Sequence, residues 1–184
     1  NLGIQHMAES CLQRRGVMID LRTHCGDERR MVGYDELMAI IRNDDVEVST
    51  GDLVCLHTGF ADRIVAAATA PDPEPVGAVC TVLDGGDRKL LNRISESGLA
   101  ALISDNVAVE QSSSVAHEMT EPGPVLPLHE HCLFKIGVPL DELWHLSKLA
   151  AWLRENRRSR FFLTAPPLRM PGAVGSPATP VATV

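Results

Sequence analysis

The sequence predicts an α/β domain with a largely parallel sheet. Three compact apolar runs of strand length, at residues 16–21, 53–57 and 99–104, alternate with segments of helical spacing. Short apolar runs bounded by turn residues are typical of buried strands. Since strands that alternate with helices form parallel sheets in α/β proteins, we expect residues 1–184 to form a single domain of this class.

The composition of the 184-residue chain excludes several classes of protein. Apolar residues make up 45% and charged residues 22%, as in ordinary globular domains. The net charge is -7 and no basic stripe is visible, so we expect no nucleic-acid partner. No apolar run approaches the ~20 residues of a membrane span, so no membrane association is expected. Five cysteines without a C-x-x-C pair favour a reduced, cytoplasmic location over a disulfide framework.

The first part of the chain predicts two strands and two helices. Residues 5–15 predict a short helix, and residues 16–21 predict the first strand. Residues 22–32 are polar and lack a period, so we expect a loop there. Asp35 is placed to cap a helix with an apolar stripe. Residues 53–57 then predict the second buried strand.

The middle of the chain continues the alternation. Residues 61–70 predict a helix and residues 79–83 a strand. Asp87 is placed to cap the next helix, which precedes the third buried strand at 99–104. We expect residues 107–127 to be mostly irregular. An irregular segment of this length inside a domain is usually functional or mobile.

Residues 125–146 carry three histidines and three carboxylates in an otherwise apolar segment. Ionisable groups are costly to bury unless they are paired or bound to a metal. Pro127 and the apolar spacing favour a short helix that ends at Gly137. An extended run would instead place His129 and His131 on one face. The spacing leaves both conformations open.

The last part of the chain predicts one helix, one strand and a packed tail. Residues 146–155 have a clear apolar stripe, and residues 161–165 read as a strand. From Pro166 onward the chain is rich in proline. We expect this tail to be irregular but packed against the domain through its apolar side chains, which are Leu168, Met170 and Val174.

Imidazole and carboxylate groups in the central stretch suggest a metal site. His129, Glu130 and His131 precede Asp141 and Glu142, and this donor set suits zinc, manganese or iron. A lone H-x-H is a weak signal. The alternative is a helix start with one satisfied histidine and solvated carboxylates.

Polar residues also follow the buried strands, where open α/β sheets place their ligands. His57 ends the second strand and Asp105 follows the third, so both are candidate substrate-binding residues. The alternatives are a histidine bonded to backbone and a carboxylate that caps a loop. Asp20 ends the first strand, where it could pair with Arg22 or His24.

Five motifs follow one another across the chain. They are R-G-V-M-I-D-L at 15–21, G-D-L-V and H-T-G within 51–59, S-D-N-V-A-V-E at 104–110, L-H-E-H and G-V-P-L-D-E within 128–142, and A-P-P-L-R and G-A-V-G-S-P within 165–177. In this order they resemble the motifs of the cyclase family that includes kynurenine formamidase-like metal hydrolases and isatin hydrolase. No single motif is decisive, but their shared order is specific.

The resemblance implies a swivelling β/β/α fold and a homodimer or homotetramer. It also implies hydrolysis of the C–N bond of an aryl-formamide or cyclic amide, a small-molecule substrate, by water activated on zinc or manganese. Glu142 matches the late carboxylate ligand of the family. Glu130 occupies the position twelve residues before it, where members carry histidine or glutamine. His129 and His131 flank Glu130 and are expected to bind the metal or to orient its ligands.

One family motif has no match in this sequence. H-x-G-T-H-x-D-x-x-x-H, which carries the principal ligands and a catalytic histidine, does not occur in residues 1–184. We therefore expect these residues to correspond to about the C-terminal two thirds of the family domain, with an incomplete site and little activity alone. One alternative is a non-catalytic binding or scaffold member. Another is a cyclase or dehydratase acting on a polyketide-like substrate.

Overall fold

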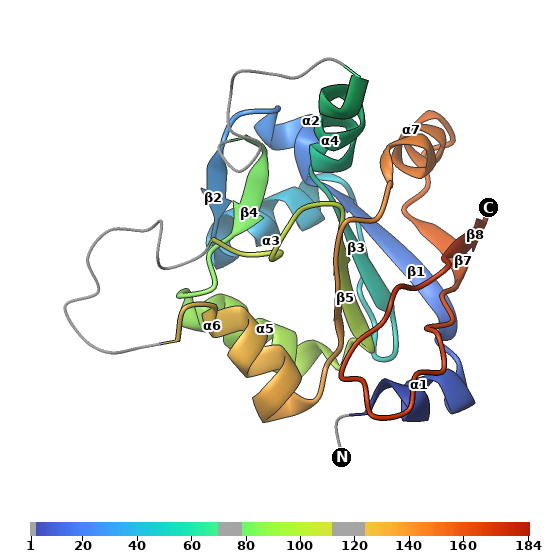
Figure 1. Cartoon of the computed structure of the whole chain (residues 1–184). Helices are drawn as coiled ribbons and strands as arrows, with labels where there is room; N and C mark the ends of the chain where they lie inside the picture. The colour runs from blue at the N-terminus through green and yellow to red at the C-terminus, as the bar shows by residue number, and fades with distance from the viewer. Residues whose placement is uncertain (1–2, 70–78, 112–123) are drawn as a thin grey trace.

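A six-stranded mixed sheet forms the centre of the molecule (Figure 1). The computed structural model describes residues 3–69, 79–111 and 124–184. In order across the sheet, the strands are β6 (Leu140–Asp141), β5 (Ala101–Ser104), β3 (Leu53–His57), β1 (Gln13–Asp20), β7 (Arg160–Thr164) and β8 (Val181–Thr183). The first four strands are parallel to one another. β7 pairs antiparallel with β1, and β8 pairs antiparallel with β7. A separate parallel pair joins β2 (Arg30–Val32) to β4 (Thr81–Leu83).

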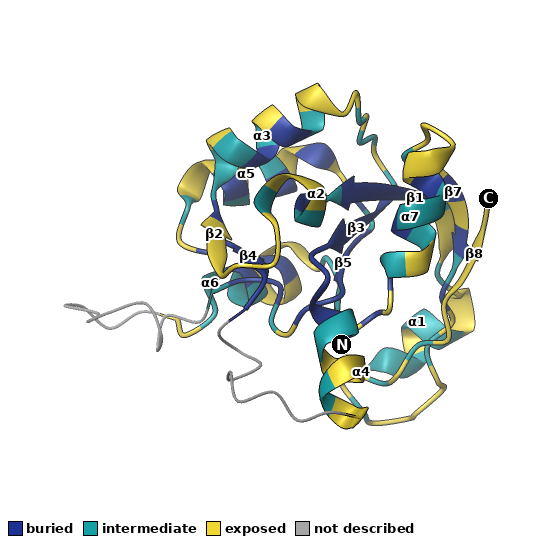
Figure 2. Ribbon diagram, turned by 90° about the horizontal axis from the view of Figure 1, so that it is seen from above, coloured by how far each residue is buried: buried dark blue, intermediate teal, exposed yellow. Residues whose placement is uncertain are grey.

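Helices cover both faces of the sheet (Figure 1). On one face, α3 (Tyr34–Asn43) and α5 (Arg88–Ser97) pack on Ile19, Val54 and Leu102. On the other face, α7 (Ser147–Glu155) packs on Met18, Cys55 and Ile103. Successive strand residues point to opposite faces, so each central strand supplies both cores. Figure 2 shows the result, in which β3 and β5 are buried along their whole length and β1 is buried over residues 16–19.

The remaining helices lie around the sheet. They are α1 (Ile4–Ser10), α2 (Leu21–Cys25), α4 (Phe60–Thr69), α6 (Pro127–His129) and the π-helix η2 (Glu130–Ile136). Residues 127–136 are therefore helical rather than extended, and the π-helix is capped by Gly137, which has a φ of 69°. Leu128 and Cys132 are fully buried, as expected of the inward face. The sequence left this conformation open, and the helical alternative is the one observed.

Two assignments near the N-terminus were wrong. Residues 13–15 belong to β1 rather than to a helix, because Gln13 pairs with Thr164 across the sheet. The expected loop at 22–32 contains α2 and β2. Both strand segments are specified by partners far away in the sequence, which local periodicity does not reveal.

The two predicted helix caps had different outcomes. Asp87 caps α5 as predicted, since its side chain accepts hydrogen bonds from the backbone N–H groups of Lys89 and Leu90. It also accepts from the N–H of Tyr34 at 2.7 Å, so one carboxylate serves the starts of two helices. The predicted Asp35 cap was wrong. The cap position of α3 is Gly33, and Asp35 instead faces Lys89 at 3.2 Å.

The C-terminal tail differs from expectation. Leu168, Met170 and Val174 are exposed, with Val174 at 83%, so the tail is not packed through these side chains. Its last residues form β8, which the sequence analysis missed. This strand extends the sheet by pairing with β7, as in Phe162 with Thr183.

Two further observations concern the length of the helices and the state of the cysteines. None of the helices in the described part of the chain is both long enough and apolar enough to cross a bilayer. The five cysteines are free thiols. Residues 70–78 and 112–123 lie outside the described residues, and with them the end of the predicted 61–70 helix and much of the irregular 107–127 segment.

Candidate active site

The carboxyl ends of the four parallel strands gather polar side chains at one edge of the sheet. The register aligns Asp20 of β1 with His57 of β3, Leu56 with Ser104 of β5, and Ile103 with Asp141 of β6. This edge is where open α/β sheets place their ligands. Two carboxylate–histidine clusters form there, one around His129 and one around His57.

His129 lies between two carboxylates. Its Nδ1 is 2.9 Å from Glu110 Oε1, and its Nε2 is 3.0 Å from Glu142 Oε1. His129 ends α6, Glu110 follows β5, and Glu142 directly follows β6. Three separate segments are therefore needed to build this cluster.

Glu110 is the structural anchor of the cluster. Only 1% of this residue is exposed. Besides the imidazole, its carboxylate accepts the backbone N–H groups of Leu128 at 2.8 Å and His129 at 2.9 Å. It therefore fixes both the first turn of α6 and the orientation of the His129 ring. Gly85 makes room for it, since a Cβ at that position would overlap the Glu110 carboxylate.

The charges of the cluster depend on one another. The hydrogen bonds from His129 to Glu110 and Glu142 raise the pKa of His129 to about 9, although burial opposes the shift. The bond to His129 lowers the pKa of Glu142, and the N–H of Ala108, at 2.9 Å from Oε2, acts in the same direction. Without a further ligand, an imidazolium therefore joins two carboxylates at neutral pH.

A cavity of about 560 Å³ opens beside this cluster. This volume lies in the range of small-molecule sites. His129 and Glu142 line it together with Trp144 and His145. Other walls come from Leu133, Leu143 and residues 176–180 of the C-terminal tail. The cavity thus combines a charged corner with walls that carry both polar and apolar side chains.

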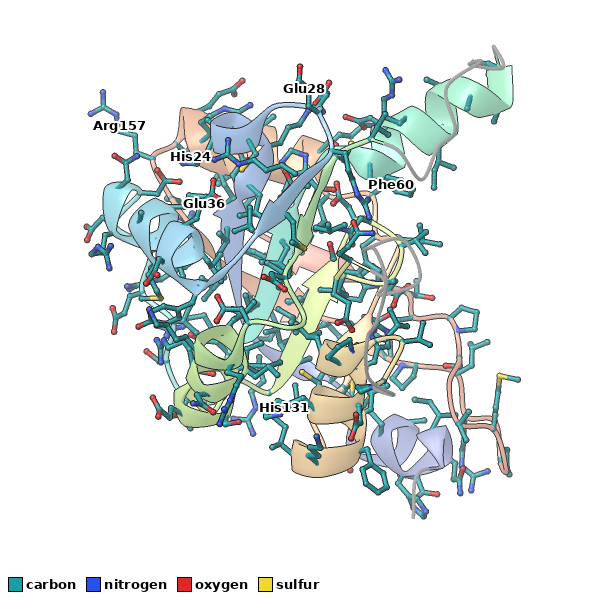
Figure 3. All side chains as sticks on the ribbon, turned by 90° about the vertical axis from the view of Figure 1, so that its left-hand side faces the viewer. His24, Glu28, Glu36, Phe60, His131 and Arg157 are labelled. Atoms are coloured by element: carbon teal, nitrogen blue, oxygen red, sulfur yellow. The ribbon has the colours of Figure 1, made fainter. Side chains whose placement is uncertain are left out.

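Glu130 and His131 do not join Glu142. Glu130 pairs with Lys135 at 3.0 Å, and His131 Nε2 lies 2.8 Å from Ser95 Oγ on α5. Figure 3 shows His131 beside α5, and His131 is not among the residues that line the cavity. Consecutive helical residues point about 100° apart, so only one of the three can face Glu142. That residue is His129, thirteen positions before Glu142, and not Glu130.

Asp105 binds the backbone and a side chain of the loop that follows β3. It is fully buried, and its carboxylate accepts the N–H of Thr58 at 2.8 Å, the Thr58 hydroxyl at 2.7 Å and the N–H of Gly59 at 2.7 Å. These bonds fix the turn after β3, where Gly59 has a φ of 85°. The geometry matches the loop-capping alternative, and a substrate contact of Asp105 stays a prediction.

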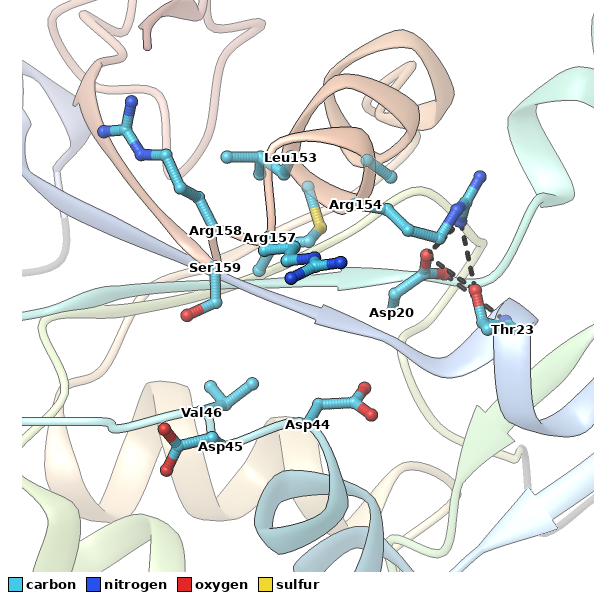
Figure 4. A pocket seen from close by; sticks show the side chains of 12 residues that line it. Asp20, Thr23, Asp44, Asp45, Val46, Leu153, Arg154, Arg157, Arg158 and Ser159 are labelled. Carbon is cyan, nitrogen blue, oxygen red and sulfur yellow. Dashed lines mark hydrogen bonds and ion pairs between the residues drawn. The ribbon is translucent and has the colours of Figure 1, made fainter.

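His57 forms the second cluster with Asp20 and Ser147. Its Nδ1 is 2.7 Å from Asp20 Oδ1, and its Nε2 is 3.2 Å from Ser147 Oγ. Asp20 Oδ2 also accepts from Arg154 at 2.6 Å and from the Thr23 hydroxyl at 2.8 Å, as Figure 4 shows. The predicted Asp20 partners were wrong. The partners of Asp20 instead include His57 of β3 and Arg154 of α7.

The two residues expected to pair with Asp20 have other partners. Arg22 binds Asp27 and Asp62, each at 2.7 Å, and His24 lies 2.8 Å from Asp44. These contacts engage both side chains with carboxylates other than Asp20.

Sequence reasoning left Glu110 open between a functional role and a loop cap, and it did not single out Ser147. The histidine partners of Glu110 and Ser147 lie 19 and 90 positions away in the chain. The local signals for Glu110 were its position shortly after a buried strand and its place at the end of the S-D-N-V-A-V-E motif.

The His129 cluster fits part of a metal site. In residues 3–69, 79–111 and 124–184, no three His, Cys, Asp or Glu side chains are arranged to hold a metal ion. His129 and Glu142 nevertheless offer adjacent nitrogen and oxygen donors at the cavity wall. Glu110 holds the other ring nitrogen of His129, which is how metal-binding histidines are typically oriented. The pair fits as two members of a larger ligand set.

Comparisons with known proteins give the family of the chain. Residues 2–111, more than half of the chain, match the family model described as "Putative cyclase". The chain therefore belongs to this cyclase family. No curated protein matches the sequence.

Solved structures confirm the fold class predicted from the sequence. A novel cyclase is 28% identical, with a TM-score of 0.76 over 99% of this chain and 56% of that one. Isatin hydrolase A from Ralstonia solanacearum is 19% identical, with a TM-score of 0.70 over 99% of this chain and 64% of that one. A potential metal-dependent hydrolase with cyclase activity is 17% identical, with a TM-score of 0.59, covering 93% and 65%. This chain thus spans less than two thirds of each of these relatives.

Proposed function

We propose that this protein takes part in the metal-dependent hydrolysis of a C–N amide bond. The observation that carries the proposal is the His129–Glu142 pair, oriented by buried Glu110 at the wall of the cavity. Family membership supports it, as do the names of structural relatives, which include isatin hydrolase and a potential metal-dependent hydrolase.

In this proposal Glu142 and His129 would bind a divalent zinc or manganese ion. Such an ion, when bound, polarises a carbonyl group and lowers the pKa of water. Glu110 accepts a hydrogen bond from His129 Nδ1, so that nitrogen keeps its proton and Nε2 is the nitrogen that would bind a metal. Because protons compete for Nε2, we expect metal affinity to rise with pH up to about 9.

The proposed substrate is an aryl-formamide or a cyclic amide. The apolar walls formed by Leu133, Leu143 and Trp144 suit a flat, largely apolar ring. The charged corner would lie against the carbonyl group of such a ring. Assembly into a homodimer or homotetramer stays a prediction, which light scattering can check.

Paired glutamate variants test the proposal. The purified protein is analysed for bound metal and assayed with isatin and N-formyl-aryl amines in added Zn²⁺ or Mn²⁺. We expect Glu142→Ala to lower metal content and turnover at least 100-fold, because a ligand is lost. The matched control is Glu130→Ala, which removes a solvated carboxylate paired with Lys135 and is expected to change neither.

A second function has one observation in its favour. The described residues contain no group of three or more His, Cys, Asp or Glu side chains that could hold a metal ion, as expected of a non-catalytic binding member of the family. That alternative gains support if neither metal nor turnover is found while small aromatic amides still bind in the cavity. Equal effects of Glu142→Ala and Glu130→Ala would contradict the proposed site.

A further inference from the structure

The His57 cluster has a geometry that the metal-dependent reaction does not use. Asp20 Oδ1 lies 2.7 Å from His57 Nδ1, and Ser147 Oγ lies 3.2 Å from Nε2. Because an ionised carboxylate only accepts hydrogen bonds, the proton of a neutral His57 lies on Nδ1. Nε2 is then an acceptor, and the Ser147 hydroxyl is its donor. This is the order of groups that activates a serine.

Asp20 is held in the charged form that this order requires. Burial by itself would raise the pKa of Asp20, but His57, Thr23 and Arg154 together lower it to about 2. Arg154 at 2.6 Å and Thr23 at 2.8 Å engage Oδ2, which leaves Oδ1 for the imidazole. The side chain of His57 is only 4% exposed, so the ring has little freedom to turn away.

The surroundings of Ser147 supply donors for a developing negative charge. Ser147 is the first residue of the nine-residue helix α7, whose cap position, Leu146, has no side-chain cap. In the part of the chain that the structure describes, the N–H of Lys148 has no backbone acceptor. Free N–H groups at a helix start stabilise an oxyanion. Ser147 is half-buried, and His145, two residues earlier, lines the 560 Å³ cavity.

We propose that Ser147 is a nucleophile, with His57 as its general base and Asp20 as the positioning residue, and that it accepts acyl groups from small activated esters. Ser147 Oγ attacks the ester carbonyl carbon while its proton moves to His57 Nε2. The tetrahedral intermediate expels the alcohol, which takes that proton, and an acyl-serine remains. Water then attacks the acyl carbon with the same base, which releases the carboxylic acid and restores the serine.

One neighbour competes for the hydroxyl. Asp62 also lies within hydrogen-bonding reach of Ser147, and it is held by Arg22 at 2.7 Å and by His145 at 2.7 Å. A single hydroxyl proton cannot serve both Asp62 and His57. We therefore expect Asp62→Asn, a weaker acceptor, to speed the reaction of Ser147.

The chain contains a matched control. Ser95 Oγ lies 2.8 Å from His131 Nε2, so it also has an imidazole neighbour. In the described residues, however, no carboxylate lies on the other nitrogen of His131. If proximity to a histidine were sufficient, Ser95 would react as readily as Ser147.

The test is labelling with a fluorophosphonate and mapping of the adduct by peptide mass spectrometry. The serine oxygen bonds to phosphorus, the P–F bond breaks, fluoride leaves and His57 takes the proton. We expect one adduct, at Ser147, with a rate at least 100-fold lower in His57→Gln. EDTA should leave the rate unchanged, so the result is independent of the proposed metal-dependent function.

A second readout does not require the His57 variant to fold. With p-nitrophenyl acetate, Asp20→Asn should slow the nitrophenol burst at least 10-fold with little change in KM, while Ser95→Ala keeps the full burst. The inference is overturned if folded protein gives no Ser147 adduct, if Ser95 is labelled equally, or if EDTA abolishes labelling.

Discussion

The two histidine clusters at the sheet edge have the same kind of partner at Nδ1 of the histidine and different partners at Nε2. In both, a carboxylate holds Nδ1, at 2.7 Å from Asp20 for His57 and at 2.9 Å from Glu110 for His129. The second nitrogen meets a hydroxyl in one cluster, Ser147, and another carboxylate in the other, Glu142. In the two proposals, the same type of side chain therefore serves two chemistries. With a hydroxyl partner, the proposed role of the ring is that of a base; between two carboxylates, the ring keeps its proton or, in the proposed site, would exchange it for a metal.

The two anchoring carboxylates, Glu110 and Asp20, also differ in their burial and in their hydrogen-bond partners. Glu110 is 1% exposed and binds two backbone N–H groups besides the imidazole. Asp20 has a side chain 15% exposed and relies on Arg154 and Thr23. We therefore expect the His129 cluster to contribute more to folding stability than the His57 cluster does.

The largest expected effect is that of Glu110→Ala. It leaves two backbone N–H groups and the His129 ring without their buried acceptor, so the free energy of unfolding should fall by about 3–5 kcal/mol. Urea denaturation followed by circular dichroism measures this. A loss below about 1 kcal/mol would show that the buried carboxylate is not an anchor. Glu130→Ala, at a solvated site, should stay within about 0.5 kcal/mol of the parent protein.

Alkaline pH should weaken the His129 cluster specifically. The folded pKa of His129, about 9, lies above the ordinary value of 6.5. The added stability is therefore complete below pH 6.5 and is lost as the pH rises through 9. Unfolding at a series of pH values from 6 to 10 should show a loss of roughly 2–3 kcal/mol. His129→Gln should remove that slope, and an unchanged slope would assign it to another group.

Asp20→Asn should have a smaller effect, with the opposite dependence on pH. The pKa of Asp20 is lowered to about 2, so its contribution is complete above pH 3.8 and is lost as the pH falls through 2. We expect the variant to be less stable by about 2 kcal/mol at pH 7 and nearly equal to the parent protein near pH 2. Asp45→Asn, at an exposed carboxylate, serves as the control. An equal loss at both pH values would indicate a packing defect instead.

The smallest expected effect is that of His131→Ala. Its contact with Ser95 lies at the surface, so its removal should cost less than about 0.5 kcal/mol and should not change metal content. His129→Ala, two residues away, should change both. Thermal melting and elemental analysis of the two variants make the comparison. Similar results for the two would remove the distinction between the two histidines.

Several features of this protein were accessible from the sequence because their causes are local. The three buried strands appeared as apolar runs, and Asp87 appeared as the cap of α5 because the carboxylate and its N–H donors are neighbours in the chain. Shared motifs identified the family. The π-helix at 130–136 was not foreseen, because neither residue spacing nor composition distinguishes it from an α-helix.

The sequence by itself determined the fold class, the central strands and the family. The tertiary structure decided which polar groups meet. Glu110, His129 and Glu142 come from three segments, and Asp20, His57 and Ser147 from three others, so their contacts depend on strand register and on the angle at which each helix leaves the sheet. Local propensities do not set that register, whereas packing of the whole core does.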